Sequence, residues 1–151
     1  MELLKVCIQN FYSFKKASLD LSPYGGLTVI KGKNKDTGGS NGSGKSVLLE
    51  AIYFGLTGKT IRKSTEDALV NNQSKKHCKV ELHLIHKENY IVIVRQKKPT
   101  KLEFLVGDTD LTKDSVLSTQ KCIDDYFNTN YKVLLLSTFF GQSNDINFLD
   151  C

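Results

Sequence analysis

The sequence lacks the features that mark fibrous, membrane and exported proteins. Its 151 residues include only 2 prolines and no low-complexity tract, which excludes a collagen-like rod and a disordered tail. The longest apolar runs, residues 90–94 and 133–136, fall far short of the roughly 20 residues that a membrane helix needs. The first residues carry no signal-peptide pattern. We therefore expect one soluble, cytoplasmic domain over residues 1–151, with no membrane partner.

Cysteine and histidine are too scattered to predict a disulfide framework or a metal site. The cysteines are Cys7, Cys78, Cys122 and Cys151, with no CxxC pair among them. This spacing predicts reduced thiols, as in a cytoplasmic protein. His83 and His86 stand three residues apart in a predicted strand, so their side chains would point to opposite faces. We expect no zinc site on this evidence.

The charge balance is mildly basic. Lysine and arginine number 21 against 16 aspartates and glutamates, which gives a net charge of +5. Such an excess is compatible with a polyanionic partner but does not identify one. Two segments offer basic side chains that fit either contacts to DNA phosphates or a solvated face. These residues are Lys59, Arg62, Lys63, Lys75, Lys76, Lys79, Lys97, Lys98 and Lys101.

Alternation of apolar and polar residues predicts strands in both halves of the chain. In the first half the expected strands are residues 2–9, 17–21 and 27–30. In the second half, residues 80–86, 90–95 and 102–106 form a similar series, with a hairpin turn at 87–89. This order predicts a three-stranded antiparallel meander.

Helical patterns separate and follow these strands. Residues 45–56 are apolar nearly all round, so we expect a helix buried against a sheet, with Gly55 and Gly58 marking its end. Residues 115–127 predict a second helix, capped by Thr112 or Asp114. A short helix is expected around residues 64–70, and a helix is favoured over a buried strand at 131–140.

The most specific motif is a glycine-rich loop between a β-branched segment and a helix. The pattern G-x-x-x-x-G-K-[ST] is matched at every specified position by Gly39-Ser40-Asn41-Gly42-Ser43-Gly44-Lys45-Ser46. Its glycines permit a backbone cradle for a β-phosphate, strengthened by the N-terminal end of the helix. Lys45 is predicted to lie between the β- and γ-phosphates of ATP, and Ser46 to offer its hydroxyl to Mg²⁺. A glycine-rich loop that precedes a helix by chance is the weaker alternative.

The sequence shows no convincing acidic strand of the kind that completes a P-loop ATPase. Residues 105–108 end in Asp108 but contain a glycine and read as a hairpin turn. Asp124 and Asp125 follow only two apolar residues within a predicted amphipathic helix. The chain therefore predicts a nucleotide cradle without a visible hydrolytic carboxylate.

Several runs of residues resemble the N-terminal lobe of the SMC-like, ABC-type ATPases of DNA break repair. The opening VCIQNFYSF is similar to that family's start, and GSNGSGKS followed by LLEAI resembles its phosphate-loop signature. The run LEAIYFGLTGK leading to LVNN is especially similar to the large subunit of the phage and bacterial recombination exonucleases. The run STFFGQ, which ends at Gln142, resembles the family's Q-loop.

The resemblance implies an α/β fold, a P-loop NTPase lobe of the ABC type with an antiparallel β-layer beside the nucleotide-binding core. In that family the acidic strand belongs to a C-terminal lobe beyond a long coiled coil, so the resemblance implies half of one ATPase head. ATP and Mg²⁺ would be held by residues 39–46, with Ser46 and Gln142 at the metal and Gln142 also near the attacking water. The implied partners are the C-terminal lobe, a second head, a metallo-phosphoesterase nuclease subunit and double-stranded DNA.

The implied function is the ATP-binding half of a DNA double-strand-break repair and recombination ATPase that regulates a partner nuclease in DNA end processing. ATP hydrolysis would then belong to a complete head dimer and not to this chain alone. Phage origin, and with it the host cytoplasm, is suggested by the resemblance only. One alternative is a free-standing nucleotide- or DNA-binding module that modulates a full-length complex without hydrolysing ATP. Another is a different SMC-like ATPase, such as a recombination mediator or a cohesin-type protein.

Two departures from the family pattern leave questions open. Tyr12 stands where the family often has an arginine that contacts nucleotide, and Lys15 and Lys16 are the candidate replacements. Residues 32–38 look like an insertion ahead of the glycine-rich loop. A basic excursion there would either contact a partner or form a solvated bulge, and the bulge is the favoured interpretation.

Overall fold

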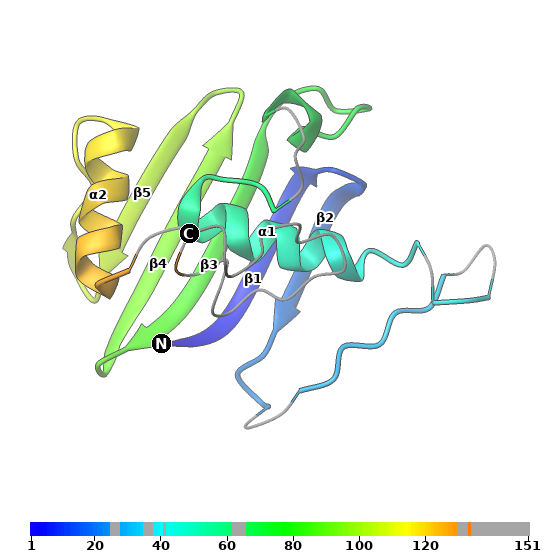
Figure 1. Cartoon of the computed structure of the whole chain (residues 1–151), viewed down its shortest axis with the longest axis horizontal. Helices are drawn as coiled ribbons and strands as arrows, with labels where there is room; N and C mark the ends of the chain where they lie inside the picture. Colours follow the sequence, from blue (N-terminus) through cyan, green and yellow to red (C-terminus); the bar gives the residue numbers. More distant parts are fainter. Residues whose placement is uncertain (25–27, 35–37, 41, 62–65, 130–132, 134–151) are drawn as a thin grey trace, which may run out of the picture.

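The structure is a computed structural model that describes residues 1–24, 28–34, 38–40, 42–61, 66–129 and 133. In this part of the chain, six strands form one antiparallel sheet in the order β2-β1-β3-β4-β5-β6 (Figure 1). The strands are β1 (Glu2–Phe11), β2 (Phe14–Asp20), β3 (Cys78–His86), β4 (Asn89–Lys97), β5 (Lys101–Val106) and β6 (Thr109–Asp110). The helices are α1 (Lys45–Thr57), the 3₁₀ turn η1 (Glu66–Leu69) and α2 (Val116–Phe127).

Strict alternation builds the centre of the sheet, as the sequence predicts. Along β3, every second residue from Cys78 to Leu84 is buried, while the residues between them are only partly buried. β3, β4 and β5 form the predicted meander. Lys87 and Glu88 connect the first pair with φ values of 48° and 65°, the positive φ pair that a tight two-residue hairpin requires. The predicted antiparallel layer is therefore confirmed.

The first hairpin is tighter than the sequence suggests. β1 runs on to Phe11 and β2 begins at Phe14, so only Tyr12 and Ser13 make the turn. Tyr12 adopts a φ of 46° there, and its N–H donates to Leu69 O at 2.8 Å. The turn is thus bonded to the last residue of η1, and η1 lies within the short helix expected at 64–70.

The prediction of a strand at residues 27–30 is wrong for residues 28–30, which are the ones that the structure describes. Residues 28–30 form no strand, and Val29 and Ile30 are 70% and 41% exposed. The β-branched run gives this segment strand propensity, but a strand also needs a neighbour to pair with. None of the described residues pairs with it.

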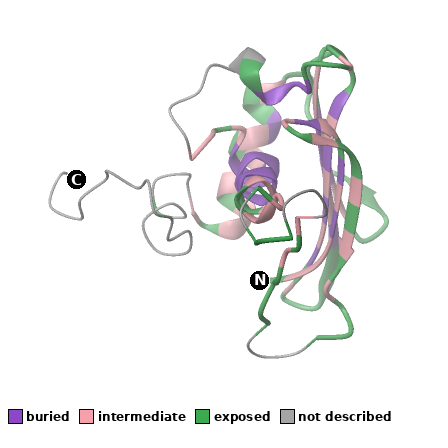
Figure 2. Ribbon diagram, turned by 90° about the vertical axis from the view of Figure 1, so that its right-hand side faces the viewer, coloured by how far each residue is buried: buried purple, intermediate pink, exposed green. Residues whose placement is uncertain are grey.

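Helix α1 lies across the inner face of the sheet (Figures 1 and 2). Its residues from Glu50 to Thr57 are all buried, which confirms the prediction of a buried helix. Gly55 lies inside the helix and does not end it, contrary to expectation. A Cβ at Gly55 would lie 2.6 Å from Leu82 Cδ1 on β3, so the glycine allows helix and sheet to pack closely.

The C-terminal end of α1 is fixed by several bonds. Gly58 ends the helix as predicted, with a φ of 70° and its N–H bonded to Phe54 O at 2.8 Å. Arg95 of β4 donates through Nε to Gly55 O at 3.2 Å, and Gln120 of α2 donates to Leu56 O at 3.1 Å. These bonds satisfy carbonyls that a helix end leaves without partners.

Helix α2 packs its rings on the β5 side of the same inner face. Phe104 of β5 contacts Tyr126 and Phe127 of α2, and His86 of β3 packs against Phe127 with tilted rings, 5.3 Å between ring centres. The cap is Ser115, whose hydroxyl accepts from Ser118 N–H at 3.1 Å, and neither Thr112 nor Asp114 has this role. The predicted cap is wrong because several polar residues precede the helix, and each of them is of a type that caps helices.

Two further expectations bear on the whole described region. Cys7, Cys78 and Cys122 are free thiols, as the sequence predicts. No helix in the described ranges has the length and apolar character to span a membrane. The helix expected at 131–140 lies outside the described residues, with only residue 133 assigned as helical.

Candidate phosphate-binding site

The glycine-rich loop leads directly into α1, as its motif predicts. Gly42 and Gly44 have φ values of 72° and 90°, which glycine adopts without the strain that a side chain would bring. Gly44 is the residue before the helix, and α1 begins at Lys45. Asn41, also part of the predicted cradle, lies outside the described residues.

The ammonium group of Lys45 turns back over the loop. It donates to the Ser40 carbonyl oxygen at 2.7 Å and to the Ser40 hydroxyl at 2.5 Å. A third bond reaches Ser43 Oγ at 3.0 Å, and Ser43 Oγ itself donates to Ser40 O at 2.7 Å. The positive charge therefore lies within the loop, held by neutral oxygens that anionic oxygens can replace at a gain in bond strength.

The N-terminal end of α1 is open to an anion. Gly44 has no side chain to cap the helix, and the first turn contains no acidic residue. The first N–H groups of a helix have no partner within it, and the helix dipole adds partial positive charge there. Ser46 is exposed in this first turn, which places a hydroxyl beside the same end. The arrangement fits a phosphate group with an associated cation.

Phe14 packs against the last glycine of the loop. A Cβ at Gly44 would lie 2.7 Å from Phe14 Cζ, so an aromatic ring occupies the space that any side chain would need. Phe14 also lines the adjoining cavity described below. The sequence gives no sign of this contact, because the two residues are 30 positions apart.

The predicted insertion closes on itself ahead of the loop. Asn34 N–H donates to Gly39 O at 2.7 Å, and Gly38 N–H donates to Asn34 O at 2.9 Å. Gly32 lies so close to Ser43 that a Cβ there would collide with the Ser43 hydroxyl. Residues 32 and 34 thus both contact the loop. Residues 35–37 lie outside the described residues, so the bulge remains a prediction.

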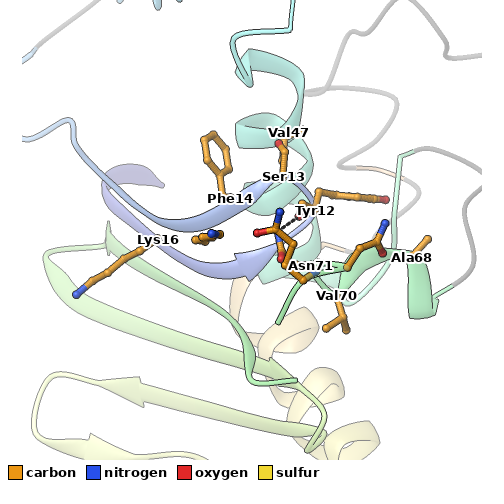
Figure 3. A pocket seen from close by; sticks show the side chains of 11 residues that line it. Tyr12, Ser13, Phe14, Lys16, Val47, Ala68, Val70 and Asn71 are labelled. Atoms are coloured by element: carbon orange, nitrogen blue, oxygen red, sulfur yellow. Dashed lines mark hydrogen bonds between the residues drawn. The ribbon is translucent and has the colours of Figure 1, made fainter. Parts of the chain in front are cut away.

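A cavity of about 820 Å³ lies beside the first turn of α1, and Phe14, which contacts Gly44 of the loop, is one of its lining residues (Figure 3). It lies between the β1–β2 turn, the first turn of α1 at Val47, and residues 68–73. Tyr12, Lys15 and Lys16 all line it. Ala17 pairs with buried Ile8 of β1 and Lys16 pairs with exposed Gln9, so Lys16 lies on the outer face of the sheet. Figure 3 shows the Lys16 side chain extending away from Tyr12, which makes Lys15 the better candidate for the missing arginine.

Asn71 holds the cavity wall together. It is 6% exposed, and its amide nitrogen donates to Tyr12 O at 2.6 Å. Its amide oxygen accepts the N–H groups of Gln73 and Ser74 at 3.0 and 3.2 Å. The sequence singles out the run 69–72 only by resemblance, and the structure gives Asn71 a physical role.

The remaining predicted site residues are distributed differently. Gln142 lies outside the described residues. Asp108 belongs to the turn between β5 and β6, and Asp124 and Asp125 belong to α2, as the sequence predicts. Two of the basic candidates are engaged on the sheet, because Lys79 pairs with Glu81 at 2.7 Å and Lys101 pairs with Glu103 at 2.5 Å.

Known proteins share this sequence pattern. The family model described as AAA domain matches residues 5–151. Exonuclease subunit 2 of Enterobacteria phage T4 is 42% identical over 77 residues, which are 51% of this chain and 14% of that protein. Exonuclease subunit 2 of Escherichia phage RB69 is 38% identical over 77 residues, which are again 51% of this chain and 14% of that protein. The DNA replication and repair protein RecF of Shewanella frigidimarina is 30% identical over 119 residues, 78% of this chain and 30% of that protein. The matched region thus spans less than a third of each relative.

Proposed function

The chain belongs to the AAA domain family and is similar to the N-terminal ATPase lobe of SMC-like repair ATPases, and from this premise we propose that it binds ATP with Mg²⁺. Its function is that of one half of an ATPase head in DNA repair and recombination. The names of its relatives, exonuclease subunit 2 and a replication and repair protein, support this assignment.

One observation carries the proposal. Residues 39–46 place the Lys45 ammonium against Ser40 and Ser43, directly before an uncapped helix end. Phosphates of ATP replace these serine oxygens as partners of Lys45, and the first N–H groups of α1 bind the same oxygens. Ser46 holds Mg²⁺ through its hydroxyl, and Mg²⁺ supplies charge neutralisation at the phosphates.

The adjoining cavity receives the remainder of the nucleotide. Its volume of about 820 Å³ lies in the range of small-molecule sites. Phe14 contacts Gly44 and also lines the cavity, Tyr12 offers an aromatic ring, and Lys15 offers a positive charge. Asn71 keeps the β1–β2 turn in place. In this assignment, Lys15 takes the role of the arginine that the family often has at the position of Tyr12.

Hydrolysis requires groups that a second polypeptide segment supplies. Asp108 lies in the β5–β6 turn, and Asp124 and Asp125 lie in α2. These elements are at the β5 edge of the sheet, whereas α1 begins on the β2 side (Figure 1). We assign the hydrolytic carboxylate to the C-terminal lobe and the signature contact to a second head. Gln142 is proposed to reach Mg²⁺ and the attacking water. A metallo-phosphoesterase nuclease subunit and double-stranded DNA are the proposed partners in DNA end processing.

The proposal is tested by MgATP binding and turnover with this chain. Lys45→Ala should abolish binding, because it removes the charge at the centre of the loop, whereas the exposed α2 variant Lys121→Ala should bind as the unaltered chain does. Binding without turnover supports a half-site that awaits its second lobe. Turnover that depends on Lys45 at low protein concentration would place a catalytic carboxylate within this chain and refute the half-site. Binding that survives Lys45→Ala would refute the phosphate loop itself.

A further inference from the structure

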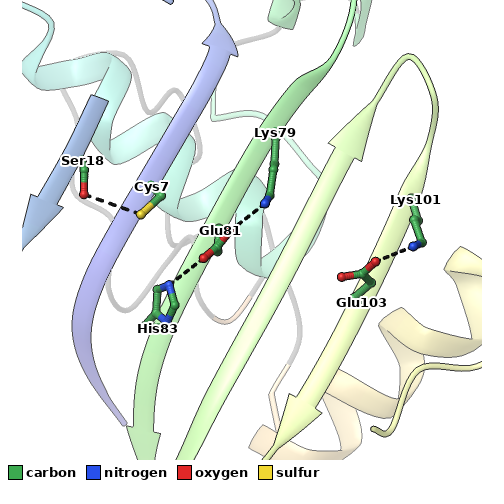
Figure 4. A network of polar contacts seen from close by, with 7 residues as sticks. All are labelled: Cys7, Ser18, Lys79, Glu81, His83, Lys101 and Glu103. Carbon is green, nitrogen blue, oxygen red and sulfur yellow. Dashed lines mark hydrogen bonds and ion pairs between the residues drawn. The ribbon is translucent and has the colours of Figure 1, made fainter. Parts of the chain in front are cut away.

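The outer face of the sheet carries a polar cluster that the proposed nucleotide site does not use. This face lies opposite to α1 (Figure 2). The strand register sets Cys7 of β1 directly beside Glu81 of β3, and His83 follows two residues later on the same face. One ligand atom from each of the three residues lies within 4.8 Å of the other two (Figure 4).

The donor set has a distinct chemical preference. Thiolate, imidazole and carboxylate are the three ligand types that zinc binds, whereas Mg²⁺ and Ca²⁺ take oxygen ligands. We propose that Cys7, Glu81 and His83 form a Zn²⁺ site with a fourth position open to water. A tetrahedral ion with bonds of about 2.0–2.3 Å holds its ligand atoms about 3.3–3.8 Å apart. Side-chain rotations that move the ligand atoms by about one ångström would therefore bring all three to bonding distance of one ion, without moving either strand.

The ligands are already oriented by neighbours on the same face. His83 Nδ1 is bonded to Tyr90 OH at 2.7 Å, so Nε2 faces the cluster and lies 2.8 Å from Glu81 Oε1. The Cys7 sulfur lies 3.5 Å from Ser18 Oγ. Outer partners of this kind fix the orientation of metal ligands. The side chains of His83 and Glu81 are only 16% and 24% exposed, so the cluster is partly shielded from water.

The nearby lysine leaves one carboxylate oxygen for the metal. Lys79 binds Glu81 Oε2 at 2.7 Å, while Glu81 Oε1 faces His83. Bonds from Zn²⁺ to Glu81 Oε1 and His83 Nε2 would replace the hydrogen bond between these two atoms, while Glu81 Oε2 stays paired with Lys79. The expectation that His83 and His86 face opposite ways is confirmed, since His86 stacks on α2. The zinc ligands come from β1 and β3 together, a combination that spacing along one strand does not reveal.

Cobalt titration of the full chain without nucleotide tests the site. We expect one equivalent of Co²⁺ to produce a thiolate-to-cobalt charge-transfer band, and stoichiometric Zn²⁺ to remove it. Cys7→Ser should lose the band. Loss of a residue that only orients a metal ligand lowers metal affinity roughly 10–100-fold, and His83→Gln, which removes a ligand itself, should lower the Co²⁺ affinity by more than that. Cys122→Ser on α2 and His86→Gln on the inner side of β3 should leave the titration unchanged.

A second measurement separates the site from a folding defect. Tyr90 is 47% exposed, so Tyr90→Phe should fold normally and bind about 10-fold more weakly. Added Zn²⁺ should raise the Tm of the unaltered chain and leave that of Cys7→Ser where it is, because only a ligand that prefers the folded state stabilises it. Absence of the thiolate band in the unaltered chain would overturn the proposal. So would an equal loss of the band in Cys122→Ser, or a full band in Cys7→Ser.

Discussion

Alanine at Gly44 perturbs the phosphate loop where backbone and packing both require glycine. The residue has a φ of 90°, and an added Cβ would lie 2.7 Å from Phe14 Cζ. A left-handed backbone costs an L-residue about 1–2 kcal/mol, of which restriction of the unfolded chain returns about 0.4–1 kcal/mol. The clash adds to this cost, although Phe14 is only partly buried and its ring can tilt. We expect Gly44→Ala to lower the free energy of unfolding by about 1–3 kcal/mol and to abolish ATP binding.

Gly38→Ala is the matched control for the backbone alone. Gly38 has a similar φ of 73°, but nothing lies within 4 Å of a Cβ placed there. It should cost about 1 kcal/mol and leave ATP binding intact. Adding Phe14→Leu to Gly44→Ala should recover only the part due to the clash. Urea unfolding and an ATP titration measure both effects, and a Gly44→Ala variant that unfolds like Gly38→Ala and still binds ATP would refute the reasoning.

Other variants test the supports of the site. Asn71→Ala should lower stability by about 1–3 kcal/mol in urea unfolding and weaken ATP binding, because it removes the bonds that its amide makes to partly buried backbone groups, whereas Asn89→Ala, at an exposed position of the β3–β4 hairpin outside the cavity, should do neither. Burial lowers the pKa of Arg95 to about 10, so it remains charged at neutral pH. Arg95→Leu should cost about 1–3 kcal/mol, also in urea unfolding, because it leaves Gly55 O and the Gln120 side chain without this donor. Burial raises the pKa of Cys78 from 9.0 to about 12. The unfolded chain therefore loses this proton first, and stability should fall from about pH 9 to pH 12. Denaturation across this range should show the fall in Cys122→Ala and not in Cys78→Ala.

The sheet could be predicted from the sequence because each strand has one buried face. A period of two is visible within a few residues, and hairpin turns separate the strands of the meander. Residues 28–30 have the same β-branched composition but pair with no strand in the described part of the chain, and composition alone cannot supply a partner strand. The sequence predicts a helix end at Gly55 for a related reason, and this prediction is wrong. A glycine near a helix end suggests a stop, and only the position of Leu82 shows that it is a close contact.

The two candidate sites differ in how far the sequence reveals them. The phosphate loop is contiguous, so eight neighbouring residues carry the motif and its chemistry together. The cavity wall at Asn71 and the ring of Phe14 come from distant segments, and only the fold brings them to the loop. The cluster of Cys7, Glu81 and His83 depends entirely on strand register. A shift of one residue between β1 and β3 would place its members on opposite faces.

Helix α1 connects the phosphate loop to the rest of the fold, and its two ends are built differently. Gly58, Arg95 and Gln120 fix the C-terminal end, where every residue from Glu50 onward is buried. Glu50 itself is 1% exposed and accepts the Ile61 N–H at 2.8 Å, so it anchors the segment that follows the helix. The N-terminal end has no cap and exposes Ser46. Because the anchored half carries the packing energy, the open half is able to keep N–H groups unpaired until an anion binds them.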